Sequence, residues 1–388
     1  MAAPEDIGLS SARLGRLRTV LAGEVEGRRL PGAVALIARR GRLGFFESFG
    51  QRSAADGAPM TNDAIFRIYS MTKPITSVAA MMLWEEGRFL LNDPIGKYLP
   101  DLAGLDVAVE RGGELERVPL EREVTVQDLL RHTSGLTYEF RGASPVHKMY
   151  MGAKVYSRAQ SSADQVATLG KLPLLHQPGT RWEYGRSTDV VGRLVEVLSG
   201  QRLSAFFGQR IFSPLGMIDT GFHVPEHHSS RLAEAFASDP DSGAAVRLLE
   251  VRDPPMFESG GGGLVSTASD YARFLQMLLN GGTLSGSRLL SRKTIELMTA
   301  DHLGPITGSP DLLLPGHGFG LGFAVRLQAG IAHVPGSVGQ YFWGGLAGTT
   351  FWIDPAEQLF ALMLIQAPGQ RDYYRSLFRD LVYSAFDD

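Results

Sequence analysis

A serine and a lysine stand three residues apart in the segment Ser70-Met71-Thr72-Lys73. On a helix this spacing places two side chains on one face. Serine becomes a nucleophile when a base takes its proton, and a lysine amine can do so where burial and neighbours hold it partly neutral. The pair therefore predicts a nucleophile with its base. The other interpretation is a serine that only caps the helix and a lysine that points into water.

Two later segments could complete such a site. Tyr184 lies in a turn before an expected helix, and a phenol close to a lysine can carry a proton. Trp343-Gly344-Gly345 lies between two strand-like runs, where glycines let a substrate approach the backbone closely. Ser70, Lys73 and Tyr184 are therefore the predicted catalytic residues.

Helices are expected to position these groups. Apolar residues at helical spacing predict a helix from about Ser70 to Leu90, and Pro74 suits its first turn, where a missing amide proton costs nothing. Similar patterns predict helices over 10–27, 123–131, 189–199, 269–280 and 371–386.

Strands are expected mainly at the two ends of the chain. Residues 33–38 and 43–50 predict a hairpin, and short aromatic and β-branched runs at 319–327, 339–345, 348–354 and 358–366 predict a largely antiparallel sheet. We therefore expect an α+β fold in which 1–58 and 316–388 form a sheet domain covered by helices from both ends. Residues 59–315 would form a mainly helical domain, with the active site in the cleft between the two domains.

The order of these motifs resembles a known superfamily. Ser70-x-x-Lys73, Tyr184-x-Arg186 and Trp343-Gly344-Gly345 are similar to the three elements of serine β-lactamases and penicillin-binding proteins. More narrowly, the chain resembles the family VIII carboxylesterases, which are class C β-lactamase-like esterases. Three further segments agree in order: Leu91–Pro94, Arg131–Leu136 and Gly261–Ser266. The resemblance implies a β-lactamase/transpeptidase-like fold with a helix-rich inserted region.

The resemblance also implies roles for individual residues. Ser70 would form an acyl-enzyme, with Lys73 and Tyr184 as general base and acid, in an order that the sequence leaves open. The amides of Ser70 and Leu346 would form the oxyanion hole.

Two departures from the family pattern bear on the substrate. The third element is usually Lys-Thr-Gly, and here Trp343 replaces the cation that pairs with a carboxylate. The second element is usually Tyr-x-Asn, and here Arg186 stands at the third position. Trp343, Gly344, Gly345 and Arg186 are the expected substrate-binding residues.

These observations predict a serine carboxylesterase that hydrolyses small-molecule esters of short to medium acyl chains. The same acyl-enzyme chemistry would also serve a β-lactamase, a D-alanyl peptidase, an amide hydrolase or an acyltransferase. A noncatalytic binding descendant of the fold, or a chance serine–lysine pair on an unrelated fold, are the remaining alternatives.

Composition limits the other possibilities. With 41 acidic and 38 basic side chains, the net charge of −3 gives no general attraction for nucleic acid. The absence of cysteine excludes disulfides, thiol nucleophiles and thiolate zinc sites, and the scattered histidines predict no metal site and no cofactor.

The first thirty residues lack an apolar signal core and no run is typical of a membrane span, so we expect a cytoplasmic location. The oligomeric state is left open.

Overall fold

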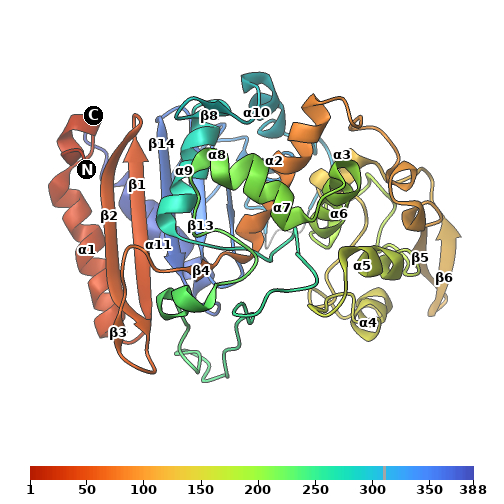
Figure 1. The fold of residues 1–388 in the computed structure, drawn as a ribbon, viewed down its shortest axis with the longest axis horizontal. Helices are drawn as coiled ribbons and strands as arrows, with labels where there is room; N and C mark the ends of the chain where they lie inside the picture. Colours follow the sequence, from red (N-terminus) through yellow and green to blue (C-terminus); the bar gives the residue numbers. More distant parts are fainter. Residues whose placement is uncertain (309–311) are drawn as a thin grey trace.

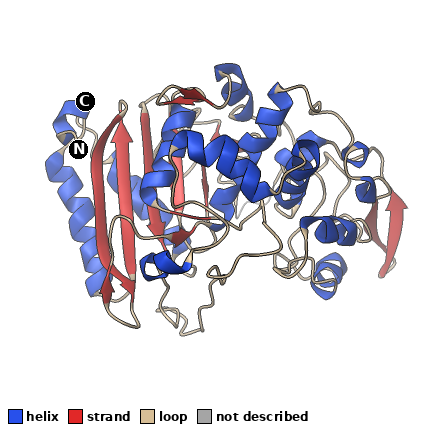
Figure 2. Ribbon diagram, in the orientation of Figure 1, coloured by secondary structure: helices blue, strands red, loops and turns tan. Residues whose placement is uncertain are grey.

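An antiparallel sheet built from both ends of the chain organises the molecule (Figures 1 and 2). The structure is a computed structural model, and it describes residues 1–308 and 312–388. The sheet strands are β1 (Gly32–Arg39), β2 (Arg42–Ser53), β3 (Ala58–Pro59), β10 (His317–Phe319), β11 (Ala324–Arg326), β12 (Tyr341–Gly344), β13 (Thr350–Asp354) and β14 (Leu359–Ile365). Their spatial order is β10-β11-β12-β13-β14-β1-β2-β3, so the first and last strands in sequence pair in the middle of the sheet.

Helices from the two chain ends cover one face of this sheet, as predicted. These are α1 (Ser11–Glu26) and α11 (Arg371–Tyr383), which contact each other. Alternate residues of β1 serve different faces: Ala33, Ala35 and Ile37 pack with the two helices, whereas Val34 and Leu36 pack into the main core. Burial on both faces explains the continuous apolar run of this strand.

The other face carries α9 (Ala268–Leu279) and, behind it, the helix that holds Lys73. Helix α9 packs on β14 and β1, and α2 (Thr72–Glu85) lies deeper in the molecule against α6 (Ser187–Ser199). Every residue of α2 from Thr72 to Leu83 is buried. A helix that is buried all round, rather than on one stripe, is a central core element.

The region between the two groups of sheet strands is mainly helical but contains small hairpins. The hairpin of β5 (Asp106–Arg111) and β6 (Glu114–Pro119), around Gly112-Gly113, was not predicted, because β6 is charged and largely exposed and the apolar run of β5 is only three residues long. The remaining elements are α3 (Val126–Leu130), α4 (Pro145–Gly152), α5 (Ser162–Leu169), α7 (Leu203–Phe207), α8 (Ser213–Leu215), α10 (Arg292–Met298), β4 (Phe66–Arg67), β7 (Val265–Ser266), β8 (Thr283–Leu284) and β9 (Ser287–Arg288). Within the described ranges, no helix has both the length and the apolar character needed to cross a membrane.

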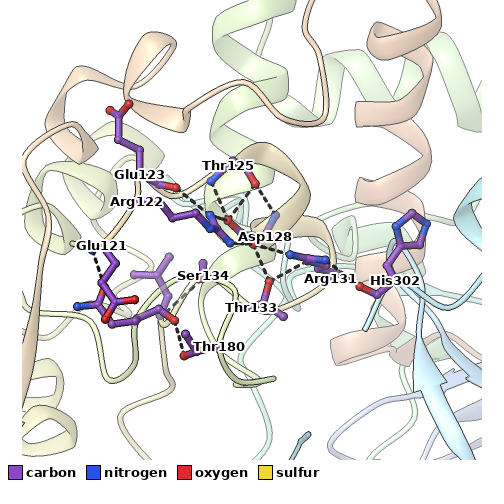
Figure 3. Close-up of polar contacts among 12 residues, drawn as sticks. Glu121, Arg122, Glu123, Thr125, Asp128, Arg131, Thr133, Ser134, Thr180 and His302 are labelled. Atoms are coloured by element: carbon purple, nitrogen blue, oxygen red, sulfur yellow. Dashed lines mark hydrogen bonds and ion pairs between the residues drawn. The ribbon is translucent and has the colours of Figure 1, made fainter. Parts of the chain in front are cut away.

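A buried carboxylate secures the turn that follows α3 (Figure 3). Asp128 is fully buried and accepts hydrogen bonds from Arg122, Arg131, Thr125 and Thr133. With Thr125 it forms a capping box at the start of α3. The network fixes the backbone immediately before the loop that runs into the catalytic region.

Candidate active site

Ser70 lies at the entrance to α2, in a 3-10 turn formed by Tyr69–Met71. Tyr69 has a φ of 43°, a left-handed conformation that is uncommon for a side chain of this size. The turn brings the half-buried Ser70 to the wall of a cavity of about 940 Å³. The predicted helix start near Ser70 is confirmed.

Lys73 lies one turn into α2 and is only 1% exposed. Its Nζ lies 3.2 Å from Ser70 Oγ, 3.0 Å from Tyr138 Oη and 2.6 Å from the carbonyl oxygen of Gly261. Three oxygen acceptors around one nitrogen match the three donors of an ammonium. Burial by itself would lower the pKa of Lys73, but the phenols of Tyr138 and Tyr184 outweigh burial, and the net shift of the pKa is upward. The structure therefore places the predicted nucleophile, Ser70, beside the predicted base, Lys73. The Lys73 amine is protonated in this arrangement.

Tyr184 projects from the turn before α6 and completes the predicted trio. Its ring centroid lies 4.6 Å from Lys73 Nζ, and its hydroxyl accepts a hydrogen bond of 3.2 Å from Trp343 Nε1. The rings of Trp182 and His132 pack against it with centroids 5.9 and 4.9 Å away. Burial first, and then the charge of Lys73, hold the pKa of His132 well below its usual range. The imidazole is therefore neutral and packs against the ring of Tyr184.

Tyr138 is the functional group that the sequence did not identify. It is 6% exposed, and its hydroxyl accepts from Lys73. Burial raises the pKa of Tyr138 to about 12, so the phenol is neutral near pH 7. The signals in the sequence were its aromatic ring, which favours a place in the pocket wall, and its position two residues after the segment Arg131–Leu136 that resembles the family. Two tyrosines, rather than one, therefore face the amine.

Arg186, an expected substrate contact, is held by the protein on several sides. Its guanidinium pairs with Glu139 and Asp189, and it lies 4.6 and 4.8 Å from the ring centroids of Tyr138 and Tyr156. The side chain is 3% exposed and still lines the cavity. It therefore supports Tyr138 as well as contributing to the cavity wall.

The glycine-rich segment 260–263 contacts Lys73 from the opposite side. Asp189 Oδ1 accepts from Ser259 Oγ at 2.6 Å and from the amide of Gly261 at 2.9 Å, while the carbonyl of Gly261 accepts from Lys73. A Cβ at Gly261 would lie 2.9 Å from Asp189 Oδ1, and one at Gly260 would lie 2.8 Å from the Thr188 carbonyl. These glycines are thus required by close packing against α6.

The third predicted element forms the cavity wall on the side of the sheet. Trp343 and Gly344 end β12, and Gly345 and Leu346 follow in the turn to β13. Arg375 of α11 donates to the carbonyl of Gly345. Because the peptide bond is trans, the amide of Leu346 points away from Arg375. That amide makes no hydrogen bond within the part of the chain that the structure describes, so it is available as a donor.

The cavity is therefore bordered by all the expected residues that the resemblance implied except Lys73. Ser70, Tyr184, Arg186, Gly344 and the other members of the third element line it, while Lys73 lies behind Ser70 in the core. Among the residues described, no three histidine or acidic side chains are grouped in a way that could hold a metal ion.

Comparison with known proteins identifies the family. A family model described as Beta-lactamase matches residues 17–383. Protein Rv1367c of Mycobacterium tuberculosis is 37% identical over 349 residues, covering 87% of this chain and 86% of the relative. Esterase EstB of Burkholderia gladioli is 31% identical over 98% of both chains. The chain therefore belongs to the Beta-lactamase family of serine hydrolases.

A solved structure agrees with this assignment. EstCE1, described as a hydrolase with promiscuous acyltransferase activity, has a TM-score of 0.79 and 25% identity, covering 96% of this chain and 98% of its own. The β-lactamase/transpeptidase-like α+β fold and the resemblance to family VIII esterases are thus confirmed.

Proposed function

We propose that this protein is a serine carboxylesterase that hydrolyses esters of short to medium acyl chains through an acyl-enzyme on Ser70. The observation that carries the proposal is the 3.2 Å contact between Ser70 Oγ and the buried Nζ of Lys73, at the wall of a large cavity. The name of the relative EstB supports ester hydrolysis, since the two chains match over nearly their whole lengths.

In the acylation step, Ser70 Oγ attacks the ester carbonyl carbon. The step starts from the form in which the Lys73 amine is neutral: the serine proton passes to the unit formed by Lys73 and Tyr184, and the carbonyl electron pair moves onto oxygen. The amides of Ser70 and Leu346 would donate to that oxyanion. Backbone donors placed in this way contribute a few kcal/mol to the transition state.

The tetrahedral intermediate then breaks its bond to the alcohol oxygen, which receives the proton held by the Lys73–Tyr184 unit. A water molecule repeats the sequence on the acyl-enzyme: its proton goes to the same unit, its oxygen attacks the carbonyl, and Ser70 leaves with the proton returned. The hydroxyl of Tyr184 accepts a hydrogen bond from Trp343. The proton of that hydroxyl is therefore directed towards the remaining neighbours of Tyr184.

The wall of the cavity supports an ester rather than a β-lactam as substrate. Trp343 presents an aromatic surface where a lysine is usual in the β-lactamases, and Gly344 and Gly345 line the same cavity. Arg186 would border the same chain without being a free charge, because Glu139 and Asp189 neutralise it.

Intact-protein mass spectrometry tests this proposal. Wild type and Ser70→Ala are mixed with p-nitrophenyl butyrate or with a cephalosporin while product release is followed. We expect a butyryl adduct and fast turnover of the ester in wild type only, with little turnover of the drug. Ester hydrolysis by Ser70→Ala at the wild-type rate would contradict the role of Ser70, and rapid cephalosporin turnover would favour a β-lactamase.

Acyl transfer is the second candidate, because EstCE1 is described as having promiscuous acyltransferase activity. In this reaction an alcohol replaces water in the second half of the cycle. Adding a primary alcohol to the butyrate assay separates the two functions. A hydrolase releases mainly butyric acid, whereas a transferase yields mainly the new butyrate ester.

A further inference from the structure

The cavity has an excess of positive charge that ester hydrolysis alone does not require. Among the described residues, six arginines and two carboxylates line it, an excess of four positive charges, whereas the whole chain has a net charge of −3. A cavity of opposite sign to the protein raises the local concentration of anions.

Most of these charges have partners, and one buried charge does not. Arg186 pairs with Glu139, and Arg375 pairs with Asp372. Arg379 makes no hydrogen bond and no ion pair within the described chain, although it is only 5% exposed and its small exposed surface lines the cavity.

Packing holds the head of Arg379 in place. Its Cζ lies 4.7 Å from the ring centroid of Phe342 and 5.1 Å from that of Trp352. Burial first, and then the nearby charge of Arg326, lower the pKa of Arg379 to about 10 against the attraction of Tyr383, Asp380 and Asp354, so the guanidinium remains charged at neutral pH. A buried charge without a hydrogen-bonded partner is unfavourable, and an anion delivered to it would relieve that cost.

We propose that Arg379 forms a subsite for a carboxylate carried by the ester substrate. This inference rests on the proposed function and names its substrate class: esters that bear a second, anionic group distant from the reacting carbonyl. A guanidinium presents a planar fork that matches a carboxylate, and Phe342 keeps the fork flat against the cavity wall.

The position of Arg379 fixes how far that carboxylate lies from the ester. Arg375, one helical turn earlier on the same face of α11, contacts the carbonyl of Gly345 beside the proposed oxyanion hole. Arg379 is about 6 Å further along the helix. The anionic group therefore sits several bonds away from the carbonyl that Ser70 attacks, so the subsite does not compete with the oxyanion hole.

Matched ester pairs test the subsite and identify which part of the substrate bears the charge. Monophenyl glutarate against phenyl valerate places the carboxylate on the acyl side, and 4-butyryloxybenzoate against phenyl butyrate places it on the alcohol side. In wild type we expect a higher kcat/KM for the anionic member of at least one pair. In Arg379→Gln that anionic-to-neutral ratio should fall about ten- to hundredfold.

Two further variants and one condition complete the test. Arg379→Lys keeps the charge without the fork and should retain part of the ratio. Arg39→Gln removes an equally buried arginine that pairs with Glu357 and Asp388 away from the cavity, and it should leave the ratio unchanged. Added salt should lower the wild-type ratio.

The result that overturns the subsite is a ratio of one or less for both pairs in wild type, or a ratio that Arg379→Gln leaves intact. If Arg379→Gln does not fold, Arg379→Lys and the salt dependence decide. Calorimetry measures the affinity of Ser70→Ala for 4-butyryloxybenzoate and for phenyl butyrate in the absence of turnover. Failure of the esterase proposal is therefore seen separately from failure of the subsite.

Discussion

The carbonyl oxygen of Gly261 lies 2.6 Å from Nζ of Lys73. The same residue donates its amide to Asp189, so one peptide segment connects a buried carboxylate on α6 with the amine on α2. A carbonyl held in this way can only accept, and it fixes one of the three protons of the ammonium. The other two then face Tyr138 and Ser70, and the contact with Ser70 lies on the path of the catalytic proton.

Asp189→Asn should therefore impair catalysis although the side chain touches no substrate. Loss of the carboxylate weakens the hydrogen bonds to Gly261 and Ser259 and removes one charge partner of Arg186. The Gly261 carbonyl then no longer holds Lys73 firmly. We expect kcat/KM for p-nitrophenyl butyrate to fall about ten- to hundredfold, mainly in kcat. Ser259→Ala, which removes one donor only, should lose less. A change confined to KM would refute this positioning role.

The second phenol makes a prediction about pH. Tyr138 is one of the groups that raise the pKa of Lys73 against the effect of burial. Tyr138→Phe removes it and lets burial lower that pKa. Because the base form must be present to activate Ser70, the acidic limb of the kcat/KM profile should move to lower pH. Profiles between pH 5 and 10 for wild type and Tyr138→Phe measure the shift, and movement towards higher pH would contradict the assignment.

The extent to which the sequence predicted this site follows from the distances along the chain. Ser70 and Lys73 meet because helical geometry alone brings residues three apart together. Tyr184 was found through its motif, not through geometry. Tyr138 and Gly261, which lie 65 and 188 residues from Lys73, join it only through tertiary packing, and no periodicity marks them. The central helices and sheet strands were predictable because their apolar patterns reflect burial, whereas the exposed β5–β6 hairpin had no such pattern.

Trp343→Phe should separate the two roles of the indole. The ring keeps its place in the cavity wall, but the bond of 3.2 Å to the Tyr184 hydroxyl is lost. We expect a fall in kcat/KM for p-nitrophenyl butyrate of about tenfold or less, the usual range for one neutral hydrogen bond. Trp352→Phe is the matched control, because that indole is buried on the α11 side of the sheet. Equal losses in both variants would mean that packing, not the bond, matters.

Asp128 makes a prediction about stability rather than activity. Burial raises the pKa of Asp128, but hydrogen bonds from Arg122, Thr125 and Thr133 outweigh it and lower the pKa to about 2. A carboxyl with a lower pKa in the folded state stabilises the protein above the unfolded value near 4, and this stability is lost as the pH falls towards 2. Asp128→Asn should lower the free energy of unfolding at pH 7 by about 3 kcal/mol, since it removes the buried carboxylate that pairs with Arg122 and Arg131.

Chemical denaturation at pH 7 and at pH 3 measures this effect. The difference between wild type and Asp128→Asn should be smaller at the lower pH, where the wild-type carboxyl begins to be protonated. The pH profile of ester hydrolysis should keep its acidic limb, which distinguishes Asp128→Asn from Tyr138→Phe. A stability difference that does not depend on pH would show that charge is not the cause.

Arg375 connects the last helix with the proposed oxyanion hole. It donates to the carbonyl of Gly345, and in a trans peptide this sets the direction of the amide of Leu346. In Arg375→Met the Gly345 carbonyl keeps, within the described chain, only the bond of 3.1 Å from the Gly348 amide, so the donor is held less firmly where negative charge develops. We expect kcat for p-nitrophenyl butyrate to fall about tenfold to hundredfold, because a preorganised donor acts mainly in the transition state.

The matched control for this variant is Arg273→Met. Arg273 also donates to a backbone carbonyl, that of Leu215, but it lies on α9 outside the cavity lining. Its loss should change kcat less than twofold while it lowers thermal stability to a similar degree. If Arg375→Met instead raises KM and leaves kcat intact, the arginine binds the substrate directly, and the amide of Leu346 is held by the turn without its help.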